Sequence, residues 1–301
     1  MRHQTSFAPA GVAFALGAYA IWGLTPLYWK ALAHFPAPEL LAHRVLWSCA
    51  TGLALVWLLG ARASLRHALG DARRWAPVTL TGLVIGLNWL VFLWAVIHDQ
   101  VLATSLGYYI TPLVNVLLGV LVLGERLRPL QIGAVSLAAL GIGQLALELG
   151  ELPWVTLVLA LSFAFYGLIR KTTAVEPVAG FALETLVLLP LGAAYLAWLG
   201  RRGDAVFLTT DAATIGLVSL SGIATAAPLI LFNAAARRLP LSTLGFFQYI
   251  APSITFVLAV LVFGEPFRRV QLLAFASVWV ALVMFSLDSF RASRADPTAA
   301  H

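Results

Sequence analysis

Four ionisable side chains stand inside long apolar stretches of this 301-residue chain: Glu39, His43, Arg44 and Glu184. A charge in such a setting is costly and is usually kept for a function. An arginine at this depth keeps its charge, and its planar guanidinium suits the recognition of an anionic group. A buried glutamate or histidine can instead gain and lose a proton. We therefore predict that Arg44 binds a ligand and that Glu184 and His43 exchange protons.

Glu39 and His43 are four residues apart, so they can touch on one face of a helix. Glu39 lies near the end of its apolar stretch. A cap at the membrane interface is therefore its expected role.

Eight further polar or aromatic residues in apolar stretches are candidates for lining a binding site. They are Trp22, Asn88, Tyr108, Tyr109, Asn115, Asn233, Gln248 and Tyr249. A bulky polar group in an apolar setting needs water, a ligand or a partner. Asn88 and Asn233 fit a packing hydrogen bond as well as a ligand contact. Tyr28 and Trp29, near the end of the first stretch, are expected to anchor at the membrane interface.

Motifs for enzymatic chemistry are missing from the sequence. There is no phosphate-binding glycine loop, no Cys/His metal cluster and no Asp-rich pair, and the single cysteine, Cys49, cannot form an intramolecular disulfide. We therefore expect a protein that is not an enzyme and that needs no cofactor and no metal.

The composition indicates an integral membrane protein. The chain is 61% hydrophobic and 11% charged, with a mean hydropathy of +0.91, whereas soluble domains average about 25% charged residues. The net charge of +6 comes from basic residues in short loops, which fits the positive-inside rule better than nucleic-acid binding. The expected partners are therefore the lipid bilayer and a small-molecule substrate, with no nucleic acid; the oligomeric state stays open.

Ten apolar stretches are long enough to cross a bilayer as helices, which needs about 20 residues each. They fall at 11–30, 39–59, 77–97, 101–123, 129–148, 152–169, 178–199, 212–235, 241–263 and 269–288. The basic residues set the orientation: 13 of the 19 Lys and Arg fall on the side of the N-terminus, 5 on the other side and Arg44 within a span. This bias predicts that both termini are cytoplasmic.

The two halves of the chain contain a duplicated segment. Tyr109–Gln131 and Tyr249–Gln271 match without a gap at an offset of 140 residues, and 11 of 23 positions are identical. Five spans separate the copies, so the second copy is inverted in the membrane, an architecture of secondary transporters. We predict a first five-helix repeat over 1–150, a second over 151–290 and a flexible tail over 291–301.

The matching faces of the two copies are small or polar, and we expect both to point inward. They are Ser105, Tyr108, Pro112, Asn115 and Gly119 in the first copy, and Gly245, Gln248, Pro252, Thr255 and Ala259 in the second. Each copy contains a Gly-Glu pair, 124–125 and 264–265, that ends one span and starts the next. The glycine suits the end of one helix, and the glutamate favours the N-terminus of the next.

Four stretches of the sequence resemble the RarD proteins of the EamA group in the drug/metabolite transporter superfamily. They read GAYAIWGLTPLYWKAL, PAPELLAHRVLWS, LGYYITPLVNVLLGVLVLGERL and LFNAAARRLPLSTLGFFQYIAPSITFVLAVLVFGEPF. The resemblance implies ten helices as two inverted five-helix repeats in the bacterial inner membrane. It also implies a small-molecule permease, of a family often named for chloramphenicol sensitivity. One departure is that Leu273 stands where the first half has Gly133, which puts tight packing of the tenth helix in question.

These observations together predict an all-α secondary transporter of small organic molecules, such as drugs or metabolites, that works by alternating access. The sequence contains no ATP-binding motif, so the energy comes from a gradient. Two alternatives remain, a membrane-embedded enzyme and a structural membrane protein without transport activity.

Overall fold

The computed structural model describes residues 9–123, 128–149, 153–173, 175–236, 238 and 247–295, and over these residues it contains helices and no strand. The elements are α1 (Pro9–Ala31), α2 (Ala37–Leu58), α3 (Arg62–Leu69), α4 (Ala72–Ile97), α5 (Val101–Leu123), α6 (Pro129–Leu149), α7 (Trp154–Thr172), α8 (Pro177–Arg202), η1 (Val206–Leu208), α9 (Ala212–Ala236), α11 (Ile250–Val257), the π-helical η2 (Leu258–Val262) and α12 (Arg269–Ala295). The predicted all-α class is confirmed for this part of the chain. α12 continues to Ala295 and so includes the first residues of the expected tail.

Helices suit a bilayer because each satisfies its own backbone hydrogen bonds, which lipid cannot do. Six helical segments are long and apolar enough to cross a membrane by length and composition: Ala10–Ala31, Ala37–Leu58, Trp75–Ile97, Pro129–Glu148, Pro177–Arg202 and Ala212–Phe232. Their outer faces carry exposed leucines such as Leu140 on α6 and Leu191 on α8. Such a surface is compatible with lipid and not with water.

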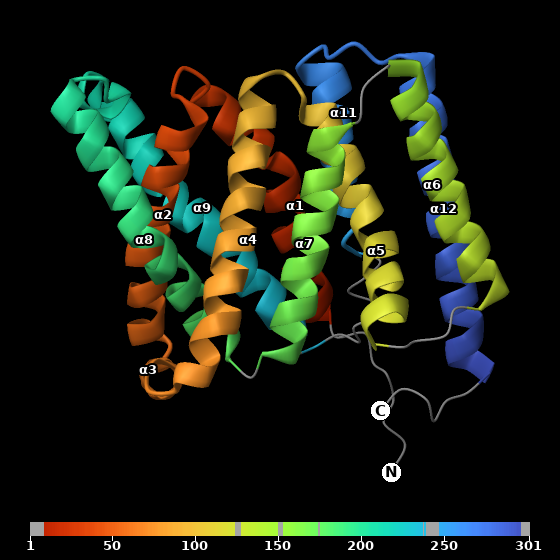
Figure 1. Ribbon diagram of the computed structural model, residues 1–301, viewed down its shortest axis with the longest axis horizontal. Coiled ribbons are helices and arrows are strands. Elements are labelled where there is room, and N and C mark those ends of the chain that lie inside the picture. Colours follow the sequence, from red (N-terminus) through yellow and green to blue (C-terminus); the bar gives the residue numbers. More distant parts are fainter. Residues whose placement is uncertain are drawn as a thin grey trace.

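The strongest helix–helix packing joins the first half of the chain to the second. α2 packs on α8, α5 on α7, α1 on α9, α4 on α7, and α6 on α12. Figure 1 shows α6 and α12 side by side at one edge of the bundle and α8 at the opposite edge. Neither half therefore forms a core by itself.

One described residue of each polar face of the duplicated segment, Ser105 and Thr255, is buried in the bundle. The hydroxyl of Ser105 on α5 donates to the carbonyl of Pro252 on α11 at 2.8 Å, and Thr255 donates to the carbonyl of Gly23 on α1 at 3.3 Å. Thr255 is 4% exposed. These bonds fix α11 against both α5 and α1.

A helix cap recurs at the same place in the two copies. The Gln131 side chain accepts the N–H of Arg128 at 3.0 Å at the start of α6, and Gln271 accepts the N–H of Arg268 at 2.8 Å at the start of α12. Equivalent residues thus close equivalent helix ends, which otherwise leave N–H groups unpaired.

Glu265 corrects an expectation from the sequence. Its carboxylate does not bind the start of the following helix, α12, but accepts the N–H groups of Val101 and Leu102 at the start of α5, at 2.7 and 2.8 Å. Gly264 allows this reversal because its φ of 65° is favourable only for glycine. Burial raises the pKa of Glu265, while the two N–H groups act in the opposite direction. The second copy therefore caps a helix of the first. Gly124 and Glu125 lie outside the described residues.

Leu273 does not disturb the pairing of α6 and α12. Its side chain is 49% exposed, so it points away from the neighbouring helix. The departure from glycine at this position therefore costs no packing.

Gly222 lets α9 cross α2 at very close range. A Cβ added there would overlap the carbonyl oxygen of Trp47 and lie 2.5 Å from the hydroxyl of Thr51. Backbone atoms cannot move aside, so only glycine fits. Thr225 follows one turn later on α9, and the close crossing presents it to α2.

We expect Gly222→Ala to destabilise the protein by about 1–3 kcal/mol, the usual cost of overpacking. The melting temperature of the detergent-purified protein checks this. Gly216→Ala is the matched control, because it lies on the same helix with nothing within 4 Å of the added Cβ. Equal melting temperatures for the two variants would contradict the close crossing.

Candidate functional site

Arg44 lies on α2 and has one hydrogen-bond partner among the described residues. Its Nε donates to the hydroxyl of Thr225 on α9 at 3.1 Å. Arg44 is 9% exposed, and its Nη1 is buried without a hydrogen-bond partner. Within the described part of the chain, it forms no salt bridge. A buried guanidinium with an unpaired N–H edge is costly unless something occupies that edge.

Two tryptophans stabilise the Arg44 guanidinium through their ring faces. Its central carbon lies 4.3 Å from the ring centroid of Trp89 on α4 and 5.1 Å from that of Trp29 on α1. Both distances suit a cation–π interaction. The expectation that Trp29 anchors at the membrane interface was wrong, because the side chain is 2% exposed. Four helices therefore meet at Arg44.

Asn88 joins three helices next to this cluster. Its amide nitrogen donates to the Leu159 carbonyl at 3.2 Å and to the Ser162 hydroxyl at 2.9 Å, both on α7. Its oxygen accepts the hydroxyl of Tyr108 on α5 at 3.1 Å. The Tyr108 ring packs edge-on against Phe163, with 5.8 Å between centroids. Asn88 therefore fixes the position of Tyr108 and has most of its hydrogen-bonding capacity satisfied by the protein.

Glu184 on α8 is paired with a cation that the sequence did not single out. One carboxylate oxygen lies 3.7 Å from Nε of Arg170 at the end of α7, and the other accepts the hydroxyl of Tyr166 at 3.2 Å. The Glu184 side chain is 3% exposed. Gly180 provides the room, since a Cβ there would overlap the Arg170 guanidinium.

Glu39 and His43 both contact η1. The carboxylate of Glu39 accepts the N–H of Phe207 at 2.9 Å, and the His43 ring lies 4.2 Å from the Phe207 ring between centroids. Glu39 is fully buried, so the expected interfacial cap is wrong. Neither ring nitrogen of His43 has a hydrogen-bond partner.

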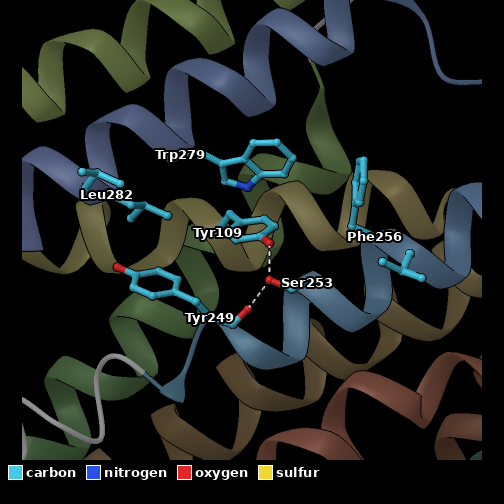
Figure 2. A pocket seen from close by; sticks show the side chains of 8 residues that line it. Tyr109, Tyr249, Ser253, Phe256, Trp279 and Leu282 are labelled. Atoms are coloured by element: carbon cyan, nitrogen blue, oxygen red, sulfur yellow. Dashed lines mark hydrogen bonds between the residues drawn. The ribbon is translucent and has the colours of Figure 1, made fainter.

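Tyr109 and Tyr249, which are equivalent in the two copies, stack on each other. Their ring centroids are 6.4 Å apart with 16° between the planes. They line a cavity of about 480 Å³ together with Ser253, Phe256 and Trp279. Figure 2 shows Trp279 over the Tyr109 ring, and the Ser253 hydroxyl bridging the Tyr109 hydroxyl and the Tyr249 carbonyl.

This cavity opens on the outer surface of the bundle. Val257 and Val283 at its margin are 47% and 58% exposed. A second, smaller cavity of about 280 Å³ lies between α2, α4 and α8 and includes Leu87 and Tyr195. Arg44, which is 9% exposed, lines neither of these two cavities.

The remaining predicted residues fall elsewhere. Trp22 packs against Tyr19 and Phe232, with centroids 5.5 and 5.9 Å away. Gln248 is half-buried just before α11. The side chains of Asn115 and Asn233 lie outside the described residues.

The sequence analysis missed Thr225, Trp89 and Arg170. Thr225 and Trp89 have no feature that separates them from other residues of apolar spans. Arg170 had one available signal: at the offset of 140 it corresponds to Lys30, just as Glu184 corresponds to Arg44. That equivalence marks Arg170 and Lys30 as matched basic residues of the two halves.

Apolar helices that enclose buried, partly paired charges define a multi-pass α-helical membrane protein. Known proteins agree. The EamA-like transporter family matches residues 9–146. An uncharacterized transporter of Vibrio cholerae is 46% identical over 96% of this chain and 95% of its own length. Protein RarD of Escherichia coli is 42% identical, with 94% and 96% covered.

The chloramphenicol-sensitive protein RarD of Pseudomonas aeruginosa is 35% identical, with 94% of this chain and 96% of the relative covered. The chain belongs to the RarD family, in the EamA group of the drug/metabolite transporter superfamily, and is a membrane transporter of that type. A crystal structure with 20% sequence identity has the same fold, with a TM-score of 0.58 over 94% of this chain and 99% of that one.

Proposed function

We propose that this protein is a secondary transporter that moves small organic molecules across the bacterial inner membrane by alternating access. The observation that carries the proposal is the buried Arg44 guanidinium, whose Nη1 has no partner among the described residues. Four helices converge on this group. An ionisable group inside a membrane protein that no protein group neutralises is well placed to bind a substrate.

The proposed architecture is ten membrane-spanning helices in two inverted five-helix repeats, with both termini cytoplasmic. The packing supports it, because packed helix pairs recur when each helix is replaced by its equivalent in the other half. The packed pair α1 and α9 becomes the packed pair α7 and α4, and the pair α5 and α7 becomes the pair α11 and α1. The recurring Gln131 and Gln271 caps and the stacking of Tyr109 on Tyr249 also fit a two-fold axis between the halves. Substrate sites of such transporters lie at the interface of the repeats.

In this proposal Arg44 holds the substrate, Trp29 and Trp89 form the wall, and Asn88 orients Tyr108 toward it. Tyr109 and Tyr249 line the opening toward the outer surface. Lining roles for Trp22, Asn115, Asn233 and Gln248 stay predictions from the sequence.

Glu184 is the proposed coupling group. Its carboxylate is buried with Tyr166 and Arg170 and can change its proton occupancy only with a change in these contacts. Proton binding there would break the ion pair with Arg170 and loosen α8 from α7. His43 is the second candidate from the sequence, and its ring faces Phe207 without a polar partner.

Arg44→Ala should reduce transport about tenfold or more, because a hydrogen bond to a charged group contributes about 1.5–3 kcal/mol. Arg44→Lys should fail as well, since an ammonium lacks the planar fork. The measurement is uptake into proteoliposomes of a solute found by thermal-shift screening of metabolites and antibiotics. Arg201→Ala, an exposed arginine on α8, is the control. Wild-type uptake by the lysine variant would contradict planar recognition.

Glu184→Gln should abolish the stimulation of uptake by an imposed pH gradient while solute exchange without a gradient continues, because only the proton-dependent step is lost. The same proteoliposomes provide both measurements. Glu148→Gln changes an exposed glutamate on α6 and should leave the stimulation intact. Full stimulation in Glu184→Gln would exclude the coupling role.

A reporter fused to the C-terminus should be active on the cytoplasmic side, as the distribution of basic residues requires. Alkaline phosphatase and green fluorescent protein report the two sides in opposite ways. A periplasmic C-terminus would overturn either the orientation or the even number of spans.

A further inference from the structure

The deep charge of each half has a different environment in the two repeats. At the offset of 140, Arg44 corresponds to Glu184 and Lys30 corresponds to Arg170. In the second half, the charges of Arg170 and Glu184 neutralise each other, because the two side chains form an ion pair at 3.7 Å. In the first half, both positions hold a cation, so no such pair can form.

Lys30 is neutralised by another residue. Its Nζ binds the carboxylate of Asp99 and the carbonyl of Val96, the latter at 3.0 Å. Among the described residues, Arg44 contacts the Thr225 hydroxyl and two ring faces. It is therefore the deep cation that lacks a carboxylate in the described part of the chain.

Glu39 does not supply the missing charge. It lies on the same helix, five residues before Arg44. At 3.6 residues per turn, the two side chains point about 140° apart around the helix axis. Its carboxylate binds the N–H of Phe207 instead. A charge buried without its counterpart is unfavourable, and a ligand can bring the counterpart.

The surroundings of Arg44 also restrict the shape of that ligand. Nε is occupied by Thr225, and the ring faces of Trp29 and Trp89 cover the guanidinium. The free group is Nη1, on the edge opposite Nε. A carboxylate oxygen can accept a charge-assisted hydrogen bond from this N–H group.

We propose that the transported substrate is a small organic monoanion whose carboxylate binds Nη1 of Arg44 and supplies the opposite charge that Arg170 supplies to Glu184 in the other repeat. This inference rests on the proposed transport function. One cation balances one negative charge, so monoanions are favoured over phosphate dianions. The organic part of the substrate packs against Trp29, Trp89 and Tyr108.

Thr225→Asp tests the proposal, because it places a fixed carboxylate beside Nε of Arg44 and neutralises the guanidinium without a ligand. Thr225→Asn has the same size and no charge, and is the matched control. Each full-length protein is purified in detergent and melted alone and with benzoate or butyrate. Their neutral amides, benzamide and butyramide, show whether the charge matters.

We expect the wild type and Thr225→Asn to be stabilised by at least one carboxylate and by neither amide. Thr225→Asp should melt several degrees above Thr225→Asn without ligand and should lose the response to carboxylates. Equal responses to acid and amide, a carboxylate response retained in Thr225→Asp, or no response of the wild type to either acid would each overturn the proposal.

The two proposals can fail separately. If a neutral solute is transported and Arg44→Ala abolishes that transport, the transporter proposal stands and the monoanion proposal is wrong. If carboxylates bind and none is transported in proteoliposomes, the binding site stands and the transport proposal is wrong.

Discussion

The guanidinium of Arg44 has to be held in an apolar interior where no described residue places a carboxylate beside it, and this constraint shapes the helices around it. Arginine does not lose its charge, so the protein must stabilise the cation itself. It does so with the ring faces of Trp29 and Trp89 and with one hydroxyl, that of Thr225. The hydroxyl is in reach only because Gly222 lets α9 cross α2 closely. The arrangement stabilises the charge and still leaves one edge of it for a ligand.

The packing also means that the site around Arg44 is formed by both halves of the chain. α2, with Arg44, packs on α8 and α9, and α5 packs on α7 and α11. Long-range bonds such as Glu265 to the start of α5 and Ser105 to the Pro252 carbonyl connect the halves. A movement of one half against the other must therefore change the contacts of Arg44. Alternating access needs this property.

The sequence predicted the helical class and the family because both depend on features that are local or repeated. Apolar length indicates a helix in a membrane, and an offset of 140 residues reveals the duplicated segment. Contacts between segments that are distant in the sequence could not be predicted. Glu265 caps α5 rather than α12, Arg170 reaches Glu184, and Trp29 is buried beside Arg44. None of these three can be read from neighbours in the chain, since each depends on how two helices cross.

The account depends most on the claim that substrate binds at Arg44. An experimental structure with a transported solute bound tests it most directly. We expect an acceptor group of the solute, a carboxylate if the monoanion proposal holds, at about 2.7–2.9 Å from the Nη atoms of Arg44, the distance typical of charge-assisted hydrogen bonds. A solute bound only in the outer cavity beside Tyr109 and Tyr249, with the Arg44 edge still unoccupied, would contradict it.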